Sequence, residues 1–397
     1  MRPMAPMRPM DGMRVIALEH AVAAPLCTRH LADLGADVIK IERPGEGDFA
    51  RNYDNFVHGQ SSHFIWLNRG KRSVTLDVKN PDARAALNTL IAGADVVIQN
   101  LAPGAAARLG LSYEALKPAN PKLVVCDISG YGESGPFVSK KAYDLLIQAE
   151  AGLIAVTGPA DEPSRVGISA ADIATGMYAL TGILSALLRR GRTGEGANIK
   201  VAMLDAVAEW TTWTQLRHAY FGSPPPRAST EHPSIAPYGA HKTKDGQIII
   251  GLQNEREWAV FCEKVLDDKS LMEDPRFNTQ AARRENRPAL TAMIEAVFAD
   301  KTSVEVADFL ERAGIANGRL NQPIDVWNHA QFEARDRWRE INTPNGPVRA
   351  MLPPFTFMDQ EAVMGDVPAV GQHTDAVLAE IGFDRQRIAR MREAGAI

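Results

Sequence analysis

One aspartate opens a long stretch of the chain that carries no charge. Asp172 is followed by residues 173–188, in which every side chain is apolar, small or uncharged. This pattern predicts a helix packed inside the protein on all faces. A carboxylate at its start is costly to ionise unless it is capped, paired or used. Two compatible interpretations stay open. In the first, Asp172 caps the free amides of the helix. In the second, the positive end of the helix holds the Asp172 carboxylate ionised and ready for chemistry.

A set of cations stands on expected loops or strand ends in the first half of the chain. Cations at the carboxyl ends of parallel strands suit a ligand that carries phosphate groups. The alternative for each of them is a solvated, charged surface. The candidates are Arg43, Arg69, Lys71, Arg72, Lys79, Arg108 and Lys141.

Other common catalytic arrangements are absent from the sequence. The nine histidines are dispersed, without an HExxH pattern or paired spacing, so we expect no metal site. The sequence has no GxSxG elbow and no GxxxxGKS loop, which disfavours a hydrolase of that type or a P-loop enzyme. The three cysteines are widely separated and suit a reducing, cytoplasmic setting.

The elements that must position these residues alternate between short apolar strands and helices. Such alternation predicts a parallel sheet in a doubly wound, Rossmann-like domain. The expected strands are residues 13–18, 37–42, 73–77, 95–99, 122–128 and 198–203, and the expected helices between them are residues 24–34, 81–92, 113–116 and 140–152.

This topology raises the possibility of a nicotinamide cofactor, because Glu42 ends the second strand where such enzymes hold a ribose. The turn after the first strand argues against it. Residues 19–25 contain no glycine, although a dinucleotide fold needs glycine there for the backbone to approach the pyrophosphate. A literal GxGxxG occurs at residues 130–135, but Pro136 follows and no helix begins there.

The chain is long enough for two domains. A Pro-rich stretch at residues 222–229 marks the clearest linker. A hairpin around residues 244–246 and helices at residues 255–265, 288–299 and 303–313 predict a small α+β unit. We therefore expect a disordered leader at residues 1–10, a large domain at 11–220, a linker at 221–237, a small α+β domain at 238–320, and a linker with a return to the large domain at 321–397.

The composition is that of an ordinary soluble globular protein, with 45% hydrophobic and 23% charged residues. A net charge of −4 argues against nucleic acid or an anionic membrane as a partner. The stretch after Asp172 holds too many small and polar residues for a membrane span. We expect a cytoplasmic protein.

Several motifs, taken in order, resemble those of family III CoA-transferases, the group of formyl-CoA transferase and the carnitine CoA-transferases. The resemblance covers nearly the whole chain after the leader. The matching stretches are GADVIKIERPG at residues 35–45, NRGKRSVTLD at 68–77, ADIATGM at 171–177, RTGEG at 192–196, DPRF at 274–277 and GQHT at 371–374.

The resemblance implies a role for each matching residue. Asp172 becomes the nucleophile, and coenzyme A is a substrate, with no tightly bound cofactor. The implied fold is an interlocked-ring homodimer, in which a large Rossmann-like domain has a parallel sheet built from both chain ends and a smaller α+β domain lies between. The residues that fall where family members hold CoA are Arg43, Leu76, Lys79, Asn100, Ala102, Arg108 and Lys141, with Tyr143 at the reactive end.

An acyl-CoA racemase shares this fold and is the main alternative; a Rossmann oxidoreductase is a more remote one. Racemases of this kind use a His-Asp pair to move the α-proton. Tyr143 and Asp144 stand at that dipeptide here. A tyrosine is a poor base at neutral pH, so the substitution favours transfer of CoA over racemisation.

The acid that accepts CoA is expected to be a short dicarboxylate. Family members of the formyl-CoA type carry a glutamine where Val22 stands, and a run of glycines that has no match between Gly222 and Gly251. Residues 208–210 and 253–258 resemble relatives that handle C4 or C5 dicarboxylates such as mesaconate, itaconate or succinate. The cations that could meet a second carboxylate are Arg165, Lys200, Arg217, Arg227 and His232.

Overall fold

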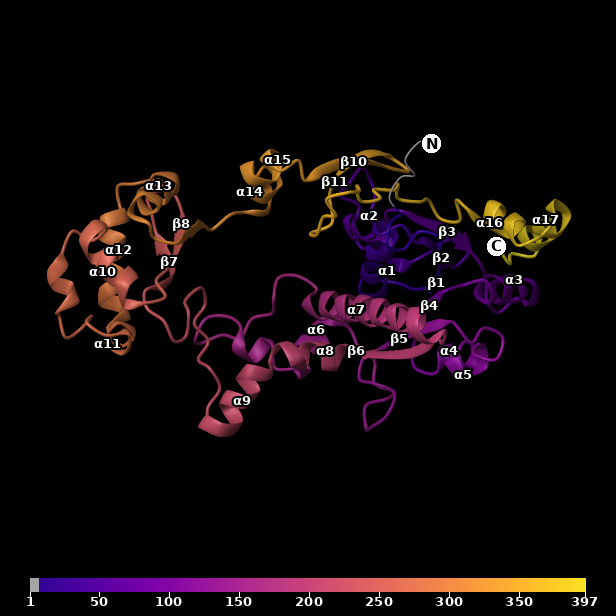
Figure 1. The fold of residues 1–397 in the computed structure, drawn as a ribbon, viewed down its shortest axis with the longest axis horizontal. Coiled ribbons are helices and arrows are strands. Elements are labelled where there is room, and N and C mark those ends of the chain that lie inside the picture. The colour runs from indigo at the N-terminus through magenta and orange to yellow at the C-terminus, as the bar shows by residue number, and fades with distance from the viewer. Residues whose placement is uncertain (1–6) are drawn as a thin grey trace. The chain divides into compact units, whose positions relative to one another are not determined.

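The structure is a computed structural model that describes residues 7–397. Within this part the chain forms two compact units. Unit 1 comprises Met1–Leu153 (described from residue 7), Arg165–Trp213 and Asp336–Ile397, and unit 2 comprises Ile154–Ser164 and Thr214–Arg335. Figure 1 shows the chain coloured from its N-terminus to its C-terminus.

A parallel sheet forms the centre of unit 1. Its order among the described residues is β3-β2-β1-β4-β5-β6, and every neighbouring pair is parallel. This is the doubly wound order. After β3 the chain crosses back to the other side of β1 and adds β4, β5 and β6 there, so the strand order switches between β1 and β4. The Rossmann-like prediction is therefore confirmed. The strands are β1 (Arg14–Leu18), β2 (Asp37–Glu42), β3 (Lys71–Thr75), β4 (Val96–Gln99), β5 (Val124–Ser129) and β6 (Ala197–Ala202).

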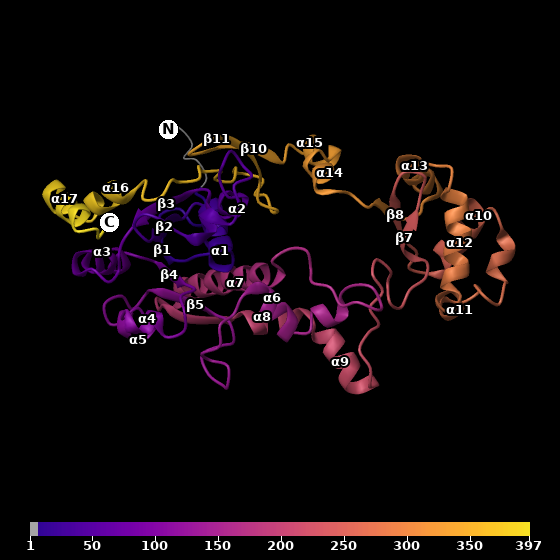
Figure 2. The ribbon, with the colours of Figure 1, turned by 180° about the vertical axis from the view of Figure 1, so that it is seen from behind.

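Helices cover both faces of this sheet. Alternate residues of each strand point to opposite faces, so Ile16 packs on the side of α3 (Pro81–Ala92), and Val15 on the side of α1 (Ala23–Asp33) and α7 (Ala170–Thr193). The views in Figures 1 and 2 agree that α16 (Thr374–Glu380) and α17 (Arg385–Glu393) lie beside α3. Burial on both sides explains the nearly unbroken apolar runs of these strands.

The C-terminal segment completes unit 1 with helices, so the expectation of a sheet built from both chain ends is wrong. All strands of the parallel sheet lie between residues 14 and 202 of the described chain. The returning chain contacts the edge strand β3 through isolated bonds, such as the donation from the His373 N–H to the Ser73 oxygen at 2.9 Å. Val377, Leu378 and Ile388 then bury their side chains in the core beneath α3.

Helix α7 is long and apolar enough to cross a membrane by length and composition alone. Its packing identifies it as the core helix of an α/β domain, because Ala179, Leu180 and Ile183 are buried against the sheet. At Gly176 it approaches α1 so closely that a Cβ would lie 2.6 Å from the Ala23 oxygen. The prediction of burial on all faces is wrong for one side, where Leu188 is 64% exposed within the chain.

Several elements of unit 1 were not predicted from the sequence. They are α2 (Ser62–Asn68), α4 (Ala105–Arg108) and the antiparallel hairpin of β10 (Trp338–Thr343) and β11 (Gly346–Met351). The N-terminal leader needs a correction too. Residues 1–6 lie outside the described residues, but Met10 is buried in the core of unit 1 and its N–H donates to the Leu34 oxygen.

Unit 2 is a small α+β assembly. The antiparallel strands β7 (Tyr238–Lys242), β8 (Gln247–Gly251) and β9 (Asn317–Arg319) pack on helices that bury Phe261, Ile294 and Leu310 against Ile248. The helices of this unit are α10 (Glu255–Lys264), α11 (Gln280–Glu285), α12 (Arg287–Phe298), α13 (Ser303–Ala313), α14 (Pro323–Trp327) and α15 (Ala330–Ala334); the last turns of α9 (Thr212–Phe221) also belong to it.

Candidate active site

The carboxyl edge of the parallel sheet brings the predicted site residues together. Arg43 directly follows β2, Leu76 to Lys79 follow β3, and Asn100 to Ala102 follow β4, with Arg108 at the end of α4. Lys141 and Tyr143 lie between β5 and α6 (Asp144–Glu150). Helix α7 crosses back from β5 to β6, so its N-terminus lies at this edge as well. In open α/β sheets this edge is where ligands bind.

Asp172 lies inside the first turn of α7 and does not cap it. The N-cap residue is Ser169, and the cap function is performed by Asp144. Its Oδ1 accepts from the N–H of Ala171 at 2.8 Å and from the N–H of Asp172 at 3.3 Å. No side chain in residues 7–397 donates to the carboxylate of Asp172. The capping interpretation is therefore wrong, and this carboxylate remains available for chemistry.

A buried glutamine holds the capping residue Asp144 in place through hydrogen bonds. Gln148 is fully buried, and its Nε2 donates to Asp144 Oδ2 at 2.7 Å and to the Ile168 oxygen at 3.3 Å. Its Oε1 accepts from the Val166 N–H at 3.1 Å. One side chain thus holds both the capping carboxylate and the segment that leads into α7, which orients Asp172.

The surroundings of Asp172 favour its protonated form. Burial, and after it the carboxylate of Asp144, raise the pKa of Asp172 to about 7. The expectation that the helix end would keep this side chain fully ionised is therefore not met, because burial and the second carboxylate outweigh the helix dipole. A carboxylate with a raised pKa is also a stronger nucleophile than a normal one once it is deprotonated.

The turn between β1 and α1 is strained. Ala21 adopts a φ of +64°, a left-handed conformation that glycine would adopt without cost. Asn100 holds the preceding residue, since its Oδ1 accepts from the His20 N–H at 3.1 Å and its Nδ2 donates to the His20 oxygen at 2.8 Å. Asp48 accepts from the Ala21 N–H at 3.2 Å. Strain of this kind clusters at functional sites, and the side chain of Asn100 acts here as a positioning group.

Aromatic side chains line the same edge. The rings of His20, Phe49, Tyr53 and His63 follow one another with centroid distances of 5.0, 5.7 and 5.6 Å. Burial is the main reason that the pKa of Tyr53 rises to about 12, and the charges of Asp48, Asp172 and Tyr143 add to it. Tyr53 therefore lies within electrostatic reach of Asp172. Sequence reasoning missed these rings, although the dense aromatic residues of FARNYDNF at 49–56 were a signal.

Four of the candidate cations are exposed and make no ion pair within residues 7–397: Arg43, Lys79, Arg108 and Lys141. The others do not qualify. Lys71 is buried 2.7 Å from Glu19, Arg69 pairs with Asp33 at 2.7 Å, and Arg72 pairs with Asp37 and Glu380 at 2.6 Å each. The interpretation of these three as ligand-binding cations is wrong, because nearby carboxylates already engage them.

The three remaining candidates differ in how far a ligand could reach them. The side chain of Leu76 is 2% exposed and belongs to the core of the sheet, so only its backbone can meet a ligand. Tyr143 is 66% exposed and stands directly before the capping residue Asp144. Ala102 is exposed in the loop after β4.

Beneath this edge lies what we call the buried charge cluster, formed by Glu19, Lys40, Asp48 and Lys71. Lys40 Nζ lies 2.8 Å from Asp48 and 3.4 Å from Glu19, and all these side chains are inaccessible. Burial alone would raise the pKa of Glu19, but Lys71 and Lys40 together hold it below the ordinary value. The cluster braces the β1–α1 turn through Asp48. No group of three His, Cys, Asp or Glu side chains in the described part of the chain could hold a metal ion.

The candidates for a second carboxylate separate into different places. Lys200 is paired with Asp127 at 2.7 Å and Glu133 at 2.6 Å, and Arg227 donates to backbone oxygens including that of Ala160. Arg165 is an exposed residue of unit 1. Arg217 and His232 line a pocket of unit 2.

Comparison with known proteins identifies the family of this chain. Residues 10–374 match the model of CoA-transferase family III. The chain is 34% identical to succinyl-CoA:glutarate CoA-transferase of Mus musculus, over 98% of this chain and 91% of the relative, and 36% identical to acetyl-CoA:oxalate CoA-transferase of Acetobacter aceti, over 87% and 90%. The crystal structure of a CAIB/BAIF family protein from Brucella suis matches 95% of this chain and 100% of its own, with 35% identity and a TM-score of 0.85. The chain therefore belongs to CoA-transferase family III and is a CoA-transferase.

Proposed function

We propose that this enzyme transfers CoA from an acyl-CoA thioester to a C4 or C5 dicarboxylic acid through a covalent aspartyl-CoA thioester at Asp172. The observation that carries the proposal is the free carboxylate of Asp172, whose capping function has been taken over by Asp144. A helix that needed Asp172 only as a cap would have used its side chain for that purpose.

The chemistry balances without ATP, metal or redox cofactor. The Asp172 carboxylate attacks the acyl-CoA carbonyl, and the carbon–sulfur bond breaks to give a mixed anhydride and CoA thiolate. The thiolate attacks the aspartyl carbonyl, which releases the donor acid and leaves aspartyl-CoA. The incoming carboxylate attacks this thioester, and the same two steps in reverse produce the new acyl-CoA and free Asp172. Binding energy from the CoA tail holds the thiolate in place between steps.

The carboxyl edge supports binding of CoA. The exposed cations Arg43, Lys79, Arg108 and Lys141 make no ion pair with any described residue, so they are free to meet the phosphate groups of the ligand. The loops that contain Leu76, Asn100 and Ala102 would approach it through their backbone, with Tyr143 near the reactive end. The β1–α1 turn supports this choice over a dinucleotide, because buried Val22 and strained Ala21 stand where a glycine would be needed.

A C4 or C5 dicarboxylate is favoured as the acid. The relatives from Mus musculus and Agrobacterium fabrum are named for succinate and glutarate, and the latter is 32% identical over 94% of this chain. Relatives named for oxalate match as well, but Val22 and the missing glycine run separate this chain from the formyl-CoA type. Succinate, glutarate, mesaconate and itaconate are the acids to test first.

The structure adds an argument against the racemase alternative. Asp144, the acid of the dipeptide that would move the α-proton, is occupied by two backbone N–H groups and by Gln148. A branched acyl-CoA incubated with the enzyme in heavy water should gain no deuterium at its α-carbon, since CoA exchange leaves that bond untouched. Enzyme-dependent uptake would favour the racemase.

Two further properties belong to the proposal. The family resemblance favours a homodimer of interlocked rings, which sedimentation and cross-linking would test. The reduced cysteines, all three buried and unpaired, fit a cytoplasmic enzyme.

The experiment that tests the mechanism traps the intermediate. Acyl-CoA without acceptor should add the mass of CoA to the peptide that contains Asp172, and hydroxylamine should remove it. Asp172→Asn should keep the thermal midpoint of the parent within a few degrees yet lose transfer almost entirely. The matched control is Asp205→Asn, in the first turn of α8 (Met203–Trp210). This aspartate is exposed and makes no ion pair in the part of the chain that the structure describes. Substantial activity of Asp172→Asn, with no adduct in the parent, contradicts the mechanism.

A further inference from the structure

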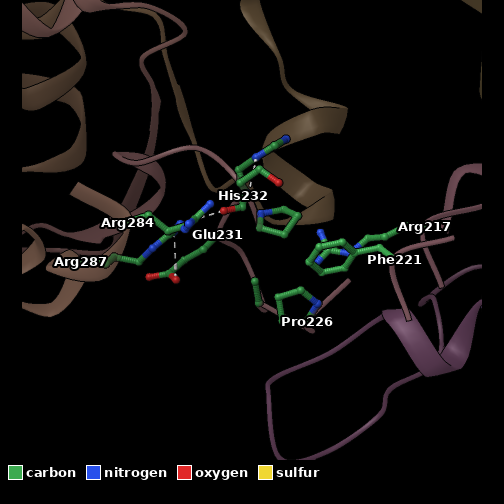
Figure 3. Close-up of a pocket in the computed structure, with 10 residues that line it drawn as sticks. Arg217, Phe221, Pro226, Glu231, His232, Arg284 and Arg287 are labelled. Atoms are coloured by element: carbon green, nitrogen blue, oxygen red, sulfur yellow. Dashed lines mark hydrogen bonds and ion pairs between the residues drawn. The ribbon is translucent and has the colours of Figure 1, made fainter. Parts of the chain in front are cut away.

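Unit 2 contains a pocket of about 700 Å³ that is rich in arginine. It is formed by the end of α9, by the irregular segment at residues 222–237, and by the junction of α11 and α12. Figure 3 shows its side chains, with arginines on two opposite sides. None of the cations at the carboxyl edge of unit 1 belongs to it.

One arginine of the pocket is already neutralised. Arg287 lies 3.1 Å from the carboxylate of Glu231, and its second nitrogen donates to the His232 and Ile235 oxygens at 2.9 and 3.1 Å. It therefore holds the wall of the pocket in shape. Glu231 is the acidic residue of the lining, and this pair cancels its charge.

The other two arginines keep their full charge. Neither Arg217 nor Arg284 pairs with a carboxylate in the described residues. The guanidinium carbon of Arg217 lies 5.2 Å from the centroid of the Phe221 ring, and its buried Nε has no hydrogen-bond partner within residues 7–397. A buried donor without a partner is costly, so this side chain lacks a group that accepts hydrogen bonds.

The two charged side chains stand on different walls of the pocket, and His232 lies between them in Figure 3. In Figure 3 Arg217 and Phe221 stand on one side, Arg284 and Arg287 on the other, and Pro226 lies below the gap between them. The rest of the lining combines the apolar Pro226, Ala228 and Pro233 with the polar His232 and Ser234. A molecule with a negative charge at each end and methylene groups between them matches both walls. A monocarboxylate or a phosphate would satisfy only one of them.

We propose that this pocket binds a dicarboxylic acid, with one carboxylate at Arg217 and the other at Arg284. The choice of a dicarboxylate among linear dianions rests on the proposed function, in which acids of this class are the substrates. The proposal also selects among the cations that the sequence suggested for a second carboxylate. Lys200 and Arg227 have ion pairs or hydrogen bonds inside the chain, whereas Arg217 has neither within residues 7–397.

Isothermal titration of the full-length enzyme with glutarate tests the proposal. Arg217→Gln and Arg284→Gln should each weaken glutarate binding at least tenfold, which corresponds to about 1.4 kcal/mol. The matched control is Arg256→Gln on α10, where an exposed arginine has no ion pair in the described chain, and its affinity should equal that of the parent. Pentanoate and inorganic phosphate should bind the parent no more tightly than glutarate binds the variants.

Two outcomes overturn the proposal: glutarate affinity that is the same in the parent and in both arginine variants, or phosphate that binds as tightly as glutarate. Melting curves of the variants show that loss of binding is not loss of fold, and Arg284 is exposed, so its replacement disturbs no core. Glutarate binding can be measured without CoA transfer. The proposed pocket and the proposed function can therefore be disproved independently of each other. Transfer that is absent with every dicarboxylate would end the proposed function while arginine-dependent glutarate binding stands.

Discussion

The buried charge cluster and the carboxyl edge above it contain the same kinds of side chain in opposite situations. Glu19 is inaccessible, bound by Lys40 and Lys71, and has a lowered pKa. Asp172 is mostly buried, bound by no cation in the described residues, and has a pKa of about 7. Likewise Lys71 forms an ion pair with Glu19, while Arg43 and Lys141 form none among residues 7–397. Completed pairs stabilise the fold, and incomplete ones leave room for a ligand.

The largest effect is expected from breaking the cluster. Lys71→Ala leaves the buried carboxylate of Glu19 with a weaker partner, and removal of one member of a buried pair costs about 3–5 kcal/mol of folding free energy. Chemical denaturation should therefore show a strongly destabilised or insoluble protein. The double variant Lys71→Met with Glu19→Leu should recover much of the loss. If Lys71→Ala unfolded at the same denaturant concentration as the parent, the buried charge cluster would contribute no more to stability than the carboxyl edge, and the comparison would fail.

The second effect concerns the pH dependence of Asp172. Because its pKa is about 7 in the folded chain, the reactive carboxylate form is lost as pH falls below this value. The rate constant kcat/KM should fall about tenfold per pH unit below pH 7, since it reports the ionisation of the free enzyme. The raised pKa also means that the folded chain binds this proton more tightly than the unfolded chain. Asp172 therefore costs stability as pH rises from about 4 to 7, and Asp172→Asn should remove that slope.

A smaller effect is expected for each unpaired cation. Arg43→Ala, Arg108→Ala and Lys141→Ala should each weaken CoA binding by about 1–3 kcal/mol, the scale of a charge-assisted hydrogen bond. The free energy of unfolding should stay near that of the parent, because no internal ion pair is lost. Inhibition by free CoA and thermal melting measure the two quantities. Unchanged CoA inhibition in all three variants would place these cations on a solvated surface.

The smallest effect is expected from Gln148, which holds the residues that orient Asp172. Gln148→Ala removes the hydrogen bonds to Asp144, Val166 and Ile168. We expect kcat to fall severalfold while the KM for acyl-CoA stays near that of the parent, because the binding cations are untouched. Steady-state kinetics with a fixed acceptor measures both constants. A severalfold rise in the KM for acyl-CoA with kcat unchanged would mean that Gln148 acts on substrate binding and does not orient Asp172.

The regular elements of unit 1 were predictable because their signals are local. Helices such as α3 and α5 (Tyr113–Leu116) have the boundaries expected from the sequence. A turn without glycine correctly disfavoured a dinucleotide site. The hairpin β10–β11 was missed because its apolar residues are few, although its two-residue turn makes its register a local property.

The site was predictable in position and only partly in role. Strand order places every residue after a strand at one edge, so the neighbourhood of Asp172 followed from topology. Which cation has a partner did not follow, because Glu19 and Asp33 precede Lys71 and Arg69 by 52 and 36 positions. The residue that caps α7, Asp144, lies 28 positions before Asp172, so no local sequence pattern reveals which of the two performs the capping.

The two faces of the sheet are completed at different times during synthesis. One face is covered once α7 has been made, by residue 193. The other waits for Val377, Leu378, Ile388 and Met391, which emerge near the end of the described chain. Until then the ribosome-bound chain leaves part of an apolar layer uncovered, and such surfaces invite aggregation. A premature stop shortly before residue 374 would therefore remove part of the core and not a dispensable tail.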